Sequence, residues 1–305
     1  MSLSLRQIRY FIATAETGKV SQAASTLGVS QSAVTEAIKA LERETGVRLF
    51  RRHPKGVTLT YEGTQFLQHA RNIMSAVADA TQAPRRARSE VSGSFSLAVT
   101  YTVAGYFLPA PLARFRRAFP AVDTKLHEMD RGDIERRLID GDIDIAVILT
   151  SNLRNADRIE TEVLIQSKRR LWLSANHPLL QAKRLSLGDI APEPYIMLTI
   201  DEAEKTALRY WQRAKLRPTV AFRTSSVEAV RSLVATGQGV AILSDMVYRP
   251  WSLEGDRIEA RALPEVVPTM DVGLAWRRGA RLDPCAEAFR DFCHMTYNAA
   301  GVRTL

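Results

Sequence analysis

The spacing of apolar residues near the start of the chain predicts three short helices. A first apolar stripe recurs at steps of three and four residues and ends before Gly18. A second, shorter segment stops at Gly28, and Ser30 has the position of an N-cap for a third helix, which we expect over residues 31–45. Two helices joined by a short glycine-containing turn form a helix-turn-helix, which places its second helix in a major groove of DNA.

The third helix has two chemically different faces. Its apolar positions would pack against the first two helices, and the opposite face carries side chains that can hydrogen-bond to base edges or phosphates. The candidates for contact with DNA on this face are Gln31, Ser32, Thr35, Glu36 and Lys39. A solvated outer face of an ordinary helical bundle would show the same pattern, so the helix alone leaves that alternative open.

The segment after the third helix favours DNA. Pro54 and Gly56 predict a tight β-hairpin whose tip carries Arg51, Arg52 and Lys55. Like charges crowded on one turn repel each other unless an anion lies opposite, and Arg binds phosphate through two N–H groups. We interpret the hairpin as the wing of a winged helix-turn-helix and add these three basic residues to the DNA-binding candidates.

The charge distribution agrees with this interpretation. Residues 1–90 hold 13 basic against 7 acidic side chains, a net charge of +6 out of the +9 of the whole chain. A concentration of positive charge in less than a third of the length is typical of a nucleic-acid-binding module.

A second long apolar stripe runs from Thr60, a candidate N-cap, to about residue 83. A helix of this length spans about 35 Å, too long for one small domain to cover. Pairing with the same helix of a second chain is the favoured solution, and packing against the chain's own following domain is the alternative. Pro84 would end the helix, and residues 85–89, which include three arginines, would form a solvated hinge.

After residue 93 the pattern of apolar residues predicts strands that alternate with helices. This alternation predicts an α/β domain with a largely parallel sheet. Candidate strands cover residues 95–100, 122–128, 143–149, 170–174, 195–198, 219–223, 240–243 and 270–276. Candidate helices cover residues 106–119, 133–139, 202–214, 227–235 and 283–294.

Contiguous motifs in the first 63 residues resemble the N-terminal signature of LysR-type transcriptional regulators. The motifs are Leu5–Phe11, Ser21–Ala24, Leu27–Thr35, Leu41-Glu42, Gly46–Arg52, Leu59-Thr60 and Gly63. Ser32 stands where the family often has Pro, and both residues are acceptable early in a helix. The order of the later elements also fits, so the resemblance covers nearly the whole chain.

The resemblance implies a three-part organisation. Residues 1–60 would form a winged helix-turn-helix, residues 61–88 a dimerisation helix and hinge, and residues 93–305 a periplasmic-binding-protein-like effector domain. That domain would have two α/β subdomains, residues 93–165 with 269–305, and residues 166–268. The implied partners are double-stranded operator DNA, a small-molecule effector, further copies in a homodimer or homotetramer, and RNA polymerase, with no cofactor.

Ligands of open α/β sheets lie beyond the carboxyl ends of strands, where backbone N–H groups of following helices point outward. Hydroxyl groups at three such ends suit a carboxylate, so we expect an acidic metabolite. The effector-binding candidates are Thr100, Tyr101, Thr102, Thr199, Ser225 and Ser226. Ser and Thr before a helix are also common N-caps, which is the alternative for each of them.

Arg131 is a further effector-binding candidate. It stands where the resembled family often has a small hydroxyl residue, and it could clamp an anion. The alternative is a surface ion pair with Asp130 or Asp133.

Three further observations narrow the classes of function. No apolar run is long enough for a membrane span, and no signal peptide opens the chain, so we expect a cytoplasmic protein that does not bind membranes. The five His and two Cys residues show no metal-ligand spacing, and no nucleotide-binding or nucleophile motif is present, which disfavours an enzyme. An architectural DNA binder without an effector would leave two thirds of the chain without a role.

Overall fold

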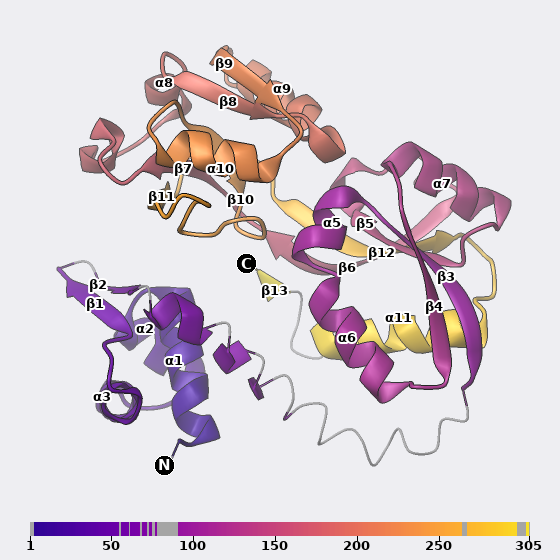
Figure 1. Ribbon diagram of the computed structural model, residues 1–305, viewed down its shortest axis with the longest axis horizontal. Helices are drawn as coiled ribbons and strands as arrows, with labels where there is room; N and C mark the ends of the chain where they lie inside the picture. Colours follow the sequence, from indigo (N-terminus) through magenta and orange to yellow (C-terminus); the bar gives the residue numbers. More distant parts are fainter. Residues whose placement is uncertain are drawn as a thin grey trace. The chain divides into compact units, whose positions relative to one another are not determined.

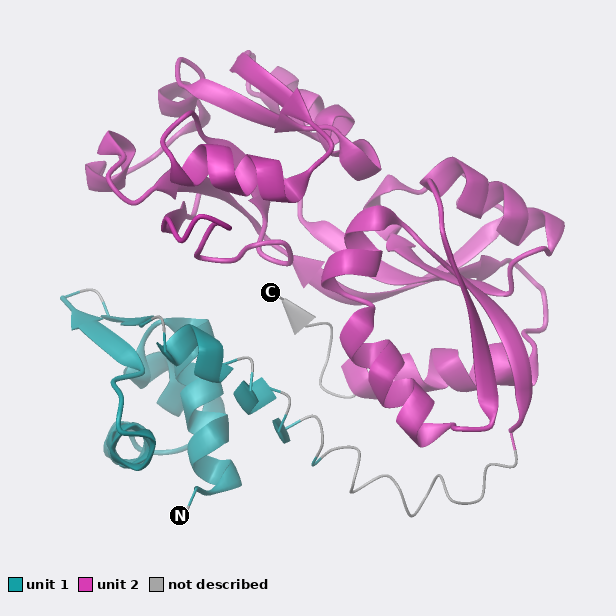
Figure 2. Ribbon diagram, viewed as in Figure 1, with its two compact units in different colours: residues 1–89 teal, residues 90–305 magenta. Residues whose placement is uncertain are grey.

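The computed structural model describes residues 3–54, 56–60, 62–67, 69–71, 73–74, 77, 91–263, 267–297 and 303–304. The chain divides into two compact units, Met1–Ser89 and Glu90–Leu305 (Figure 2). Lys55, Pro84 and the predicted hinge at residues 85–89 lie outside the described residues. Within the described ranges, no helix has the length and apolarity that a bilayer crossing requires.

The first unit opens with the three predicted helices, α1 (Leu5–Thr17), α2 (Val20–Leu27) and α3 (Gln31–Thr45) (Figure 1). Ser30 is the N-cap of α3, because its Oγ accepts a hydrogen bond from the backbone N–H of Ala33 at 3.2 Å. The three C-caps are left-handed glycines, Gly18, Gly28 and Gly46. Local capping signals therefore set the bounds of α3 as the sequence predicted.

The predicted hairpin is also present, as β1 (Phe50–His53) paired antiparallel with β2 (Gly56–Leu59). It is fixed to the turn after α1, because the backbone N–H of Val57 donates to the carbonyl of Gly18 at 2.9 Å. Gly56 is required there: a Cβ at this position would lie 2.2 Å from the Gly18 carbonyl oxygen.

The helix that follows the wing begins where the sequence predicted. Thr60 Oγ1 accepts a hydrogen bond from the N–H of Gly63 at 2.9 Å, and the described residues between 62 and 77 are helical. Part of its apolar stripe packs on the core of α1 to α3: Ala70 is buried, and the ring of Phe66 lies 5.0 Å from that of the buried Phe11. The first turns thus pack against the core of the chain's own DNA-binding unit.

The second unit starts with a six-stranded sheet of strand order β13-β6-β12-β5-β3-β4 (Figure 1). Its strands are β3 (Gly93–Val99), β4 (Val122–Glu128), β5 (Ile145–Leu149), β6 (Ile159–Ser167), β12 (Met270–Arg277) and β13 (Arg303–Thr304). Its helices are α5 (Tyr101–Tyr106), α6 (Pro109–Ala118), α7 (Arg131–Asp140) and α11 (Pro284–Tyr297), with a short 3-10 turn η1 (Thr150–Asn152). Side chains of α5, α6 and α11 pack in one core with β3 and β5, and those of α7 pack on the opposite face.

The second subdomain is a smaller α/β layer. Its strands are β7 (Arg169–Ser174), β8 (Pro194–Leu198), β9 (Thr219–Thr224), β10 (Ala241–Ser244) and β11 (Ile258–Arg261). Its helices are η2 (Pro178–Gln181), α8 (Leu187–Ile190), η3 (Ile200–Glu202), α9 (Ala203–Arg213) and α10 (Val227–Ala235). The chain passes between the subdomains at Ser167–Arg169 and again after β11, where residues 264–266 lie outside the described part.

The expectation of a largely parallel sheet is confirmed for the six-stranded sheet, in which β12 alone among the described strands runs in the opposite direction, and is wrong for the three-stranded sheet of order β10-β7-β11. β12 returns from the second subdomain and pairs antiparallel with both β5 and β6, and β7 pairs antiparallel with β10 and β11. Parallel pairing is confined to β3 with β4 and β5, β13 with β6, and β8 with β9. The returning strand lets the chain cross between subdomains twice.

One predicted helix is also wrong. The segment 106–119 contains the end of α5 and all of α6, and α5 starts five residues earlier, at Tyr101. Prolines at positions 109 and 111 begin a new helix instead of continuing the old one. Tyr101 and Thr102 therefore sit in the first turn of a helix.

Candidate DNA-binding face and effector cleft

The outer face of α3 is available to a partner. Gln31, Ser32, Glu36 and Lys39 are exposed, and Thr35 is partly buried. The Thr35 hydroxyl donates to the carbonyl of Gln31 at 2.9 Å, so it can still accept a hydrogen bond from a base or from water. Val34, Ile38 and Leu41 are buried on the inner face.

Two of these candidates neutralise each other in the free protein. Lys39 Nζ lies 2.9 Å from Glu36 Oε1, and this hydrogen bond lowers the pKa of the Glu36 carboxyl. Exposed pairs of this kind rearrange at little cost, so DNA can take over either partner.

The wing presents its two described arginines without competing partners. Arg51 lies opposite Thr58 and Arg52 opposite Val57, and both arginines are exposed. Successive strand residues point to opposite faces, so the two guanidinium groups diverge. Within the described part of the chain, neither forms a hydrogen bond or an ion pair, whereas Lys55 falls outside it.

Glu42 positions the wing, a role that the sequence patterns did not predict. In those patterns Glu42 appeared only as part of the motif Leu41-Glu42. Its Oε1 accepts hydrogen bonds from the backbone N–H groups of Leu49, at 2.8 Å, and Phe50, at 3.1 Å. These bonds fix the start of the wing to the last turn of α3. The sequence feature that could have indicated this role is a glutamate directly after the apolar, buried Leu41.

The predicted hydroxyl residues behave differently from one another. Ser226 caps α10, accepting a hydrogen bond from the N–H of Ala229 at 3.1 Å, as the capping alternative expected. Thr100 precedes α5 but does not cap it, and its buried Oγ1 has no hydrogen-bond partner among the described residues. Ser225 is exposed, and Thr199 lies at the end of β8, partly buried.

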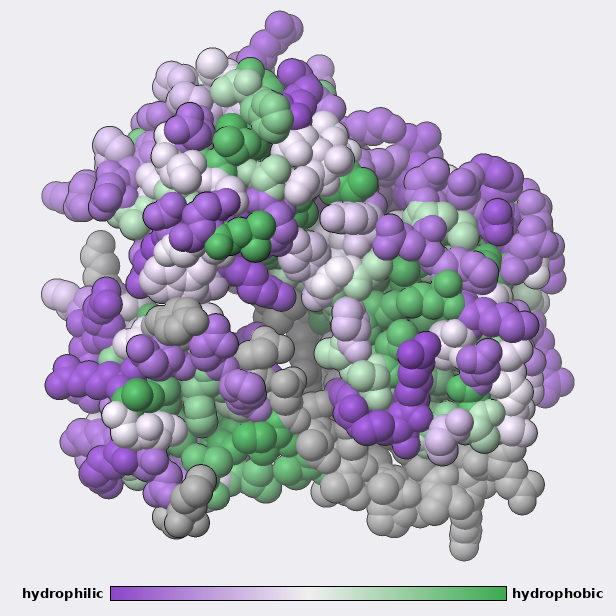
Figure 3. Space-filling view, viewed as in Figure 1, coloured by the Kyte–Doolittle hydropathy of each residue, from purple (hydrophilic) through white to green (hydrophobic). Residues whose placement is uncertain are grey.

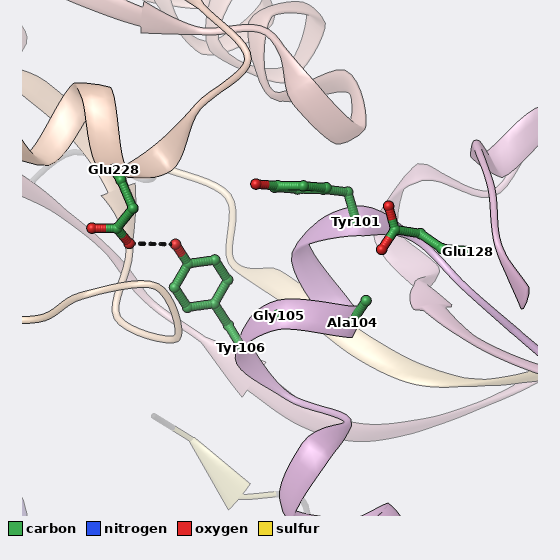
Figure 4. Close-up of a pocket in the computed structure, with 6 residues that line it drawn as sticks. All are labelled: Tyr101, Ala104, Gly105, Tyr106, Glu128 and Glu228. Atoms are coloured by element: carbon green, nitrogen blue, oxygen red, sulfur yellow. Dashed lines mark hydrogen bonds between the residues drawn. The ribbon is translucent and has the colours of Figure 1, made fainter. Parts of the chain in front are cut away.

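A pocket of about 440 Å³ opens beside α5 (Figure 4). Of the candidates, Tyr101 lines it. Tyr106 and Glu228 together form one side of it, the tyrosine hydroxyl donating to the Glu228 carboxylate at 2.8 Å. Burial, together with this bond, raises the pKa of Tyr106 to about 12. The remaining lining residues are Ala104, Gly105 and Glu128.

Arg131 is not on the surface, and the alternative of a pair with Asp130 or Asp133 is wrong. Its side chain is 11% exposed and lies between two other carboxylates. The guanidinium donates to Glu202 through Nε at 3.0 Å and Nη2 at 2.9 Å, and Nη1 contacts Glu135.

The loop after β8 joins the two subdomains at this place. The carboxylate of Asp201 accepts a hydrogen bond from the backbone N–H of Thr102 at 2.6 Å, and its carbonyl accepts one from Asn152 Nδ2 at 3.0 Å. Thr102, Arg131 and the Thr199 loop, which the sequence placed at separate strand ends, are therefore brought together. Asp201 was missed, although it is an acidic residue two positions beyond a predicted strand-end site.

The exposed surface outside these sites is mixed. On the face shown in Figure 3, hydrophilic side chains dominate, with hydrophobic patches over the first subdomain at the right. Large hydrophobic residues that remain exposed in the second unit include Tyr101, Leu126 and Phe222. In the described ranges, no group of three His, Cys, Asp or Glu side chains is arranged to hold a metal ion.

Comparisons with known proteins agree with this architecture. Residues 5–64 match the family described as bacterial regulatory helix-turn-helix protein, lysR family, and residues 88–297 match the LysR substrate binding domain. The chain is 29% identical to the uncharacterized HTH-type transcriptional regulator YnfL of Escherichia coli (strain K12), over 95% of this chain and 97% of the relative. It is 28% identical to the RuBisCO operon transcriptional regulator of Allochromatium vinosum, over 96% of both chains. The crystal structure of HinK, a LysR family transcriptional regulator from Pseudomonas aeruginosa, superposes with a TM-score of 0.61 at 28% identity, covering 96% of this chain and 98% of that one.

Proposed function

The chain belongs to the LysR family of transcriptional regulators, and from this premise we propose that it controls a promoter in response to an acidic metabolite bound between the two subdomains. The family and its relatives are transcriptional regulators and not enzymes, which argues against an enzymatic function for this chain. The observation that carries the DNA-binding part is the exposed polar face of α3 next to a wing with two exposed arginines.

In this proposal α3 reads base edges and the wing holds the phosphate backbone. Gln31, Ser32, Thr35, Glu36 and Lys39 supply the groups that discriminate base pairs. Arg51, Arg52 and Lys55 supply sequence-independent affinity.

The effector part rests on the polar groups gathered between the subdomains. Thr100 has a buried hydroxyl that finds no hydrogen-bond partner among the described residues, Arg131 supplies a guanidinium, the N–H group of Thr102 is bound by the Asp201 carboxylate, and Tyr101 lines the adjacent pocket. Thr199, Ser225 and Ser226 follow the paired strands β8 and β9 of the second subdomain, where the Thr199 N–H donates to the Thr224 carbonyl at 2.8 Å. A carboxylate is the ligand group that satisfies a guanidinium and a hydroxyl together.

Assembly completes the proposal. Two or four copies would join through the helix after the wing, with its described first turns supporting the DNA-binding unit and its later turns pairing with another copy. Effector binding would change how the subdomains pack, and with them the spacing of the two DNA-binding units. We place this regulator in the cytoplasm, with RNA polymerase as a further partner at the promoter.

A binding assay tests both parts. The affinity of the full chain for duplex DNA flanking its own gene is measured by fluorescence anisotropy, with and without a panel of small carboxylic acids, and the melting temperature is followed in parallel. We expect one acid to raise the melting temperature and to change the affinity for DNA. An architectural DNA binder would bind DNA but respond to no acid.

A further inference from the structure

The guanidinium of Arg131 has more hydrogen-bonding capacity than its own subdomain uses. Glu135 is only 1% exposed and lies one turn further along α7, where it contacts Nη1 of Arg131. Glu135 is satisfied within the first subdomain, because it also accepts hydrogen bonds from the backbone N–H groups of Arg154, at 3.1 Å, and Asn155, at 3.0 Å. The Nε and Nη2 edge of Arg131 therefore remains, oriented by Glu135, as a fork that fits one carboxylate side-on.

In this structure that fork is occupied by Glu202 from the second subdomain. The Glu202 carboxylate receives both N–H groups of Arg131 and also lies 3.3 Å from Arg154 Nη2 and 3.6 Å from Lys205 Nζ. Three cations around one carboxylate form an anion-binding site, and the anion in it belongs to the protein. The pKa of Glu202 is lowered, chiefly by the hydrogen bonds from Arg131.

The segment that delivers Glu202 is held in a strained backbone. Asp201 has φ 50° and Glu202 has φ 62°, both in the left-handed region that residues other than glycine adopt at a cost. Two such residues in succession need external support, and the bonds to Thr102, Asn152 and Arg131 supply it. Release of the segment would relieve this strain, which favours its replacement by an equivalent external anion.

We propose that Glu202 is an internal stand-in for the effector carboxylate, and that an acidic effector binds by displacing it from the Arg131 fork. This inference rests on the proposed function, and it assigns to Arg131 the role of the anion-binding residue. Displacement breaks the contact between Arg131 and Glu202 across the subdomains, so it couples occupation of the site to the packing of the two subdomains.

Acetate is the probe for this site, and acetamide is its neutral control of similar shape. Glu202→Ala removes the internal carboxylate and leaves the fork without its partner. We expect acetate to raise the melting temperature of this variant by roughly 3–6 °C at ten times its Kd, more than it raises that of the wild type, and acetamide to have no such effect. Glu204→Ala is the matched control, because Glu204 pairs with Arg223 inside the second subdomain and does not touch Arg131.

A second substitution localises the response. Arg131→Lys keeps a positive charge beside Glu135 but removes the fork, so the acetate-specific gain should be lost in the double variant with Glu202→Ala. If the alanine variant does not fold, Glu202→Gln is compared with the wild type in the same way, since it keeps the side-chain shape and removes the charge.

The contrary result is a Glu202 variant that gains no more stability from acetate than the wild type, or one whose gain survives Arg131→Lys; either overturns the inference. These measurements use protein without DNA. Rescue by acetate, in a protein whose affinity for promoter DNA no acid changes, would contradict the proposed function and leave this inference standing.

Discussion

Removing the Glu42 carboxylate is expected to loosen the wing while the effector domain stays intact. Glu42 accepts hydrogen bonds from the backbone N–H groups of Leu49 and Phe50, two residues whose side chains are buried. A buried N–H group left without a partner costs about 1–3 kcal/mol, so Glu42→Ala should destabilise the DNA-binding unit by about 2–4 kcal/mol. Glu42→Gln keeps an acceptor oxygen but loses its charge, and it should cost about 1 kcal/mol.

The two units can be followed separately in the full chain. All four tryptophans lie in the second unit, at positions 172, 211, 251 and 276. Tryptophan fluorescence therefore reports the effector domain, and far-ultraviolet circular dichroism reports both units. A loss of about 3 kcal/mol corresponds to a fall of roughly 10–25 °C in the melting temperature of a domain of this size.

The expected result for Glu42→Ala is an early transition in circular dichroism with an unchanged fluorescence transition. Glu36→Ala is the control on the same helix, because Glu36 is exposed and pairs only with Lys39; it should leave both transitions in place. A Glu42→Ala protein that melts like the wild type would refute the reasoning, as would equal shifts of the two signals.

Four further substitutions test other parts of the structure. Thr35→Ala should cost about 1 kcal/mol in operator affinity and little on random DNA; equal losses on the two duplexes would count against base reading by Thr35. Arg51→Ala should weaken binding to both duplexes and reduce the salt slope of log Kd by about one, and an unchanged slope would remove Arg51 from the phosphate contacts. Gly56→Ala should destabilise the first unit by about 1–3 kcal/mol, measured by circular dichroism, because its Cβ would meet the Gly18 carbonyl; a wild-type melting curve would contradict this. Glu202 has a pKa below its usual 4.5, so its ion pair stabilises the protein above that pH and is lost as the pH falls through the lower folded value. The difference in free energy of unfolding between the wild type and Glu202→Gln should therefore decrease as the pH is lowered from about 6 to about 3. A difference that stays constant over this range would exclude the ion pair with Arg131 as its source.

The sequence was most informative where structure depends on neighbouring residues. The bounds of α3 follow from Ser30 and Gly46, whose capping roles are local. Strand β6 was missed because its alternation is broken by a bulge opposite Val272 and Gly273, and because its partner β12 lies about a hundred residues away. Its pairing could not be deduced from a window of the sequence.

The effector site shows the same limit. The sequence marked Arg131 as unusual, but its partner Glu202 is 71 positions away and comes from the other subdomain. The left-handed backbone at Asp201 could not be predicted, because neither glycine nor asparagine occupies this position. The hydroxyls were recognisable as a class, yet only the packed structure separates the helix cap Ser226 from Thr100, whose buried hydroxyl has no hydrogen-bond partner in the described part of the chain.

The most direct test of the central claim is dimethyl sulfate footprinting of the full chain on DNA flanking its own gene. Dimethyl sulfate methylates guanine N7, which lies in the major groove, where α3 is proposed to bind. We predict protection of guanines in two segments separated by a whole number of helical turns, as two wing-bearing units would produce. Binding that leaves every guanine N7 reactive, or no salt-sensitive binding at all, would contradict the proposal that this chain regulates transcription through α3 and its wing.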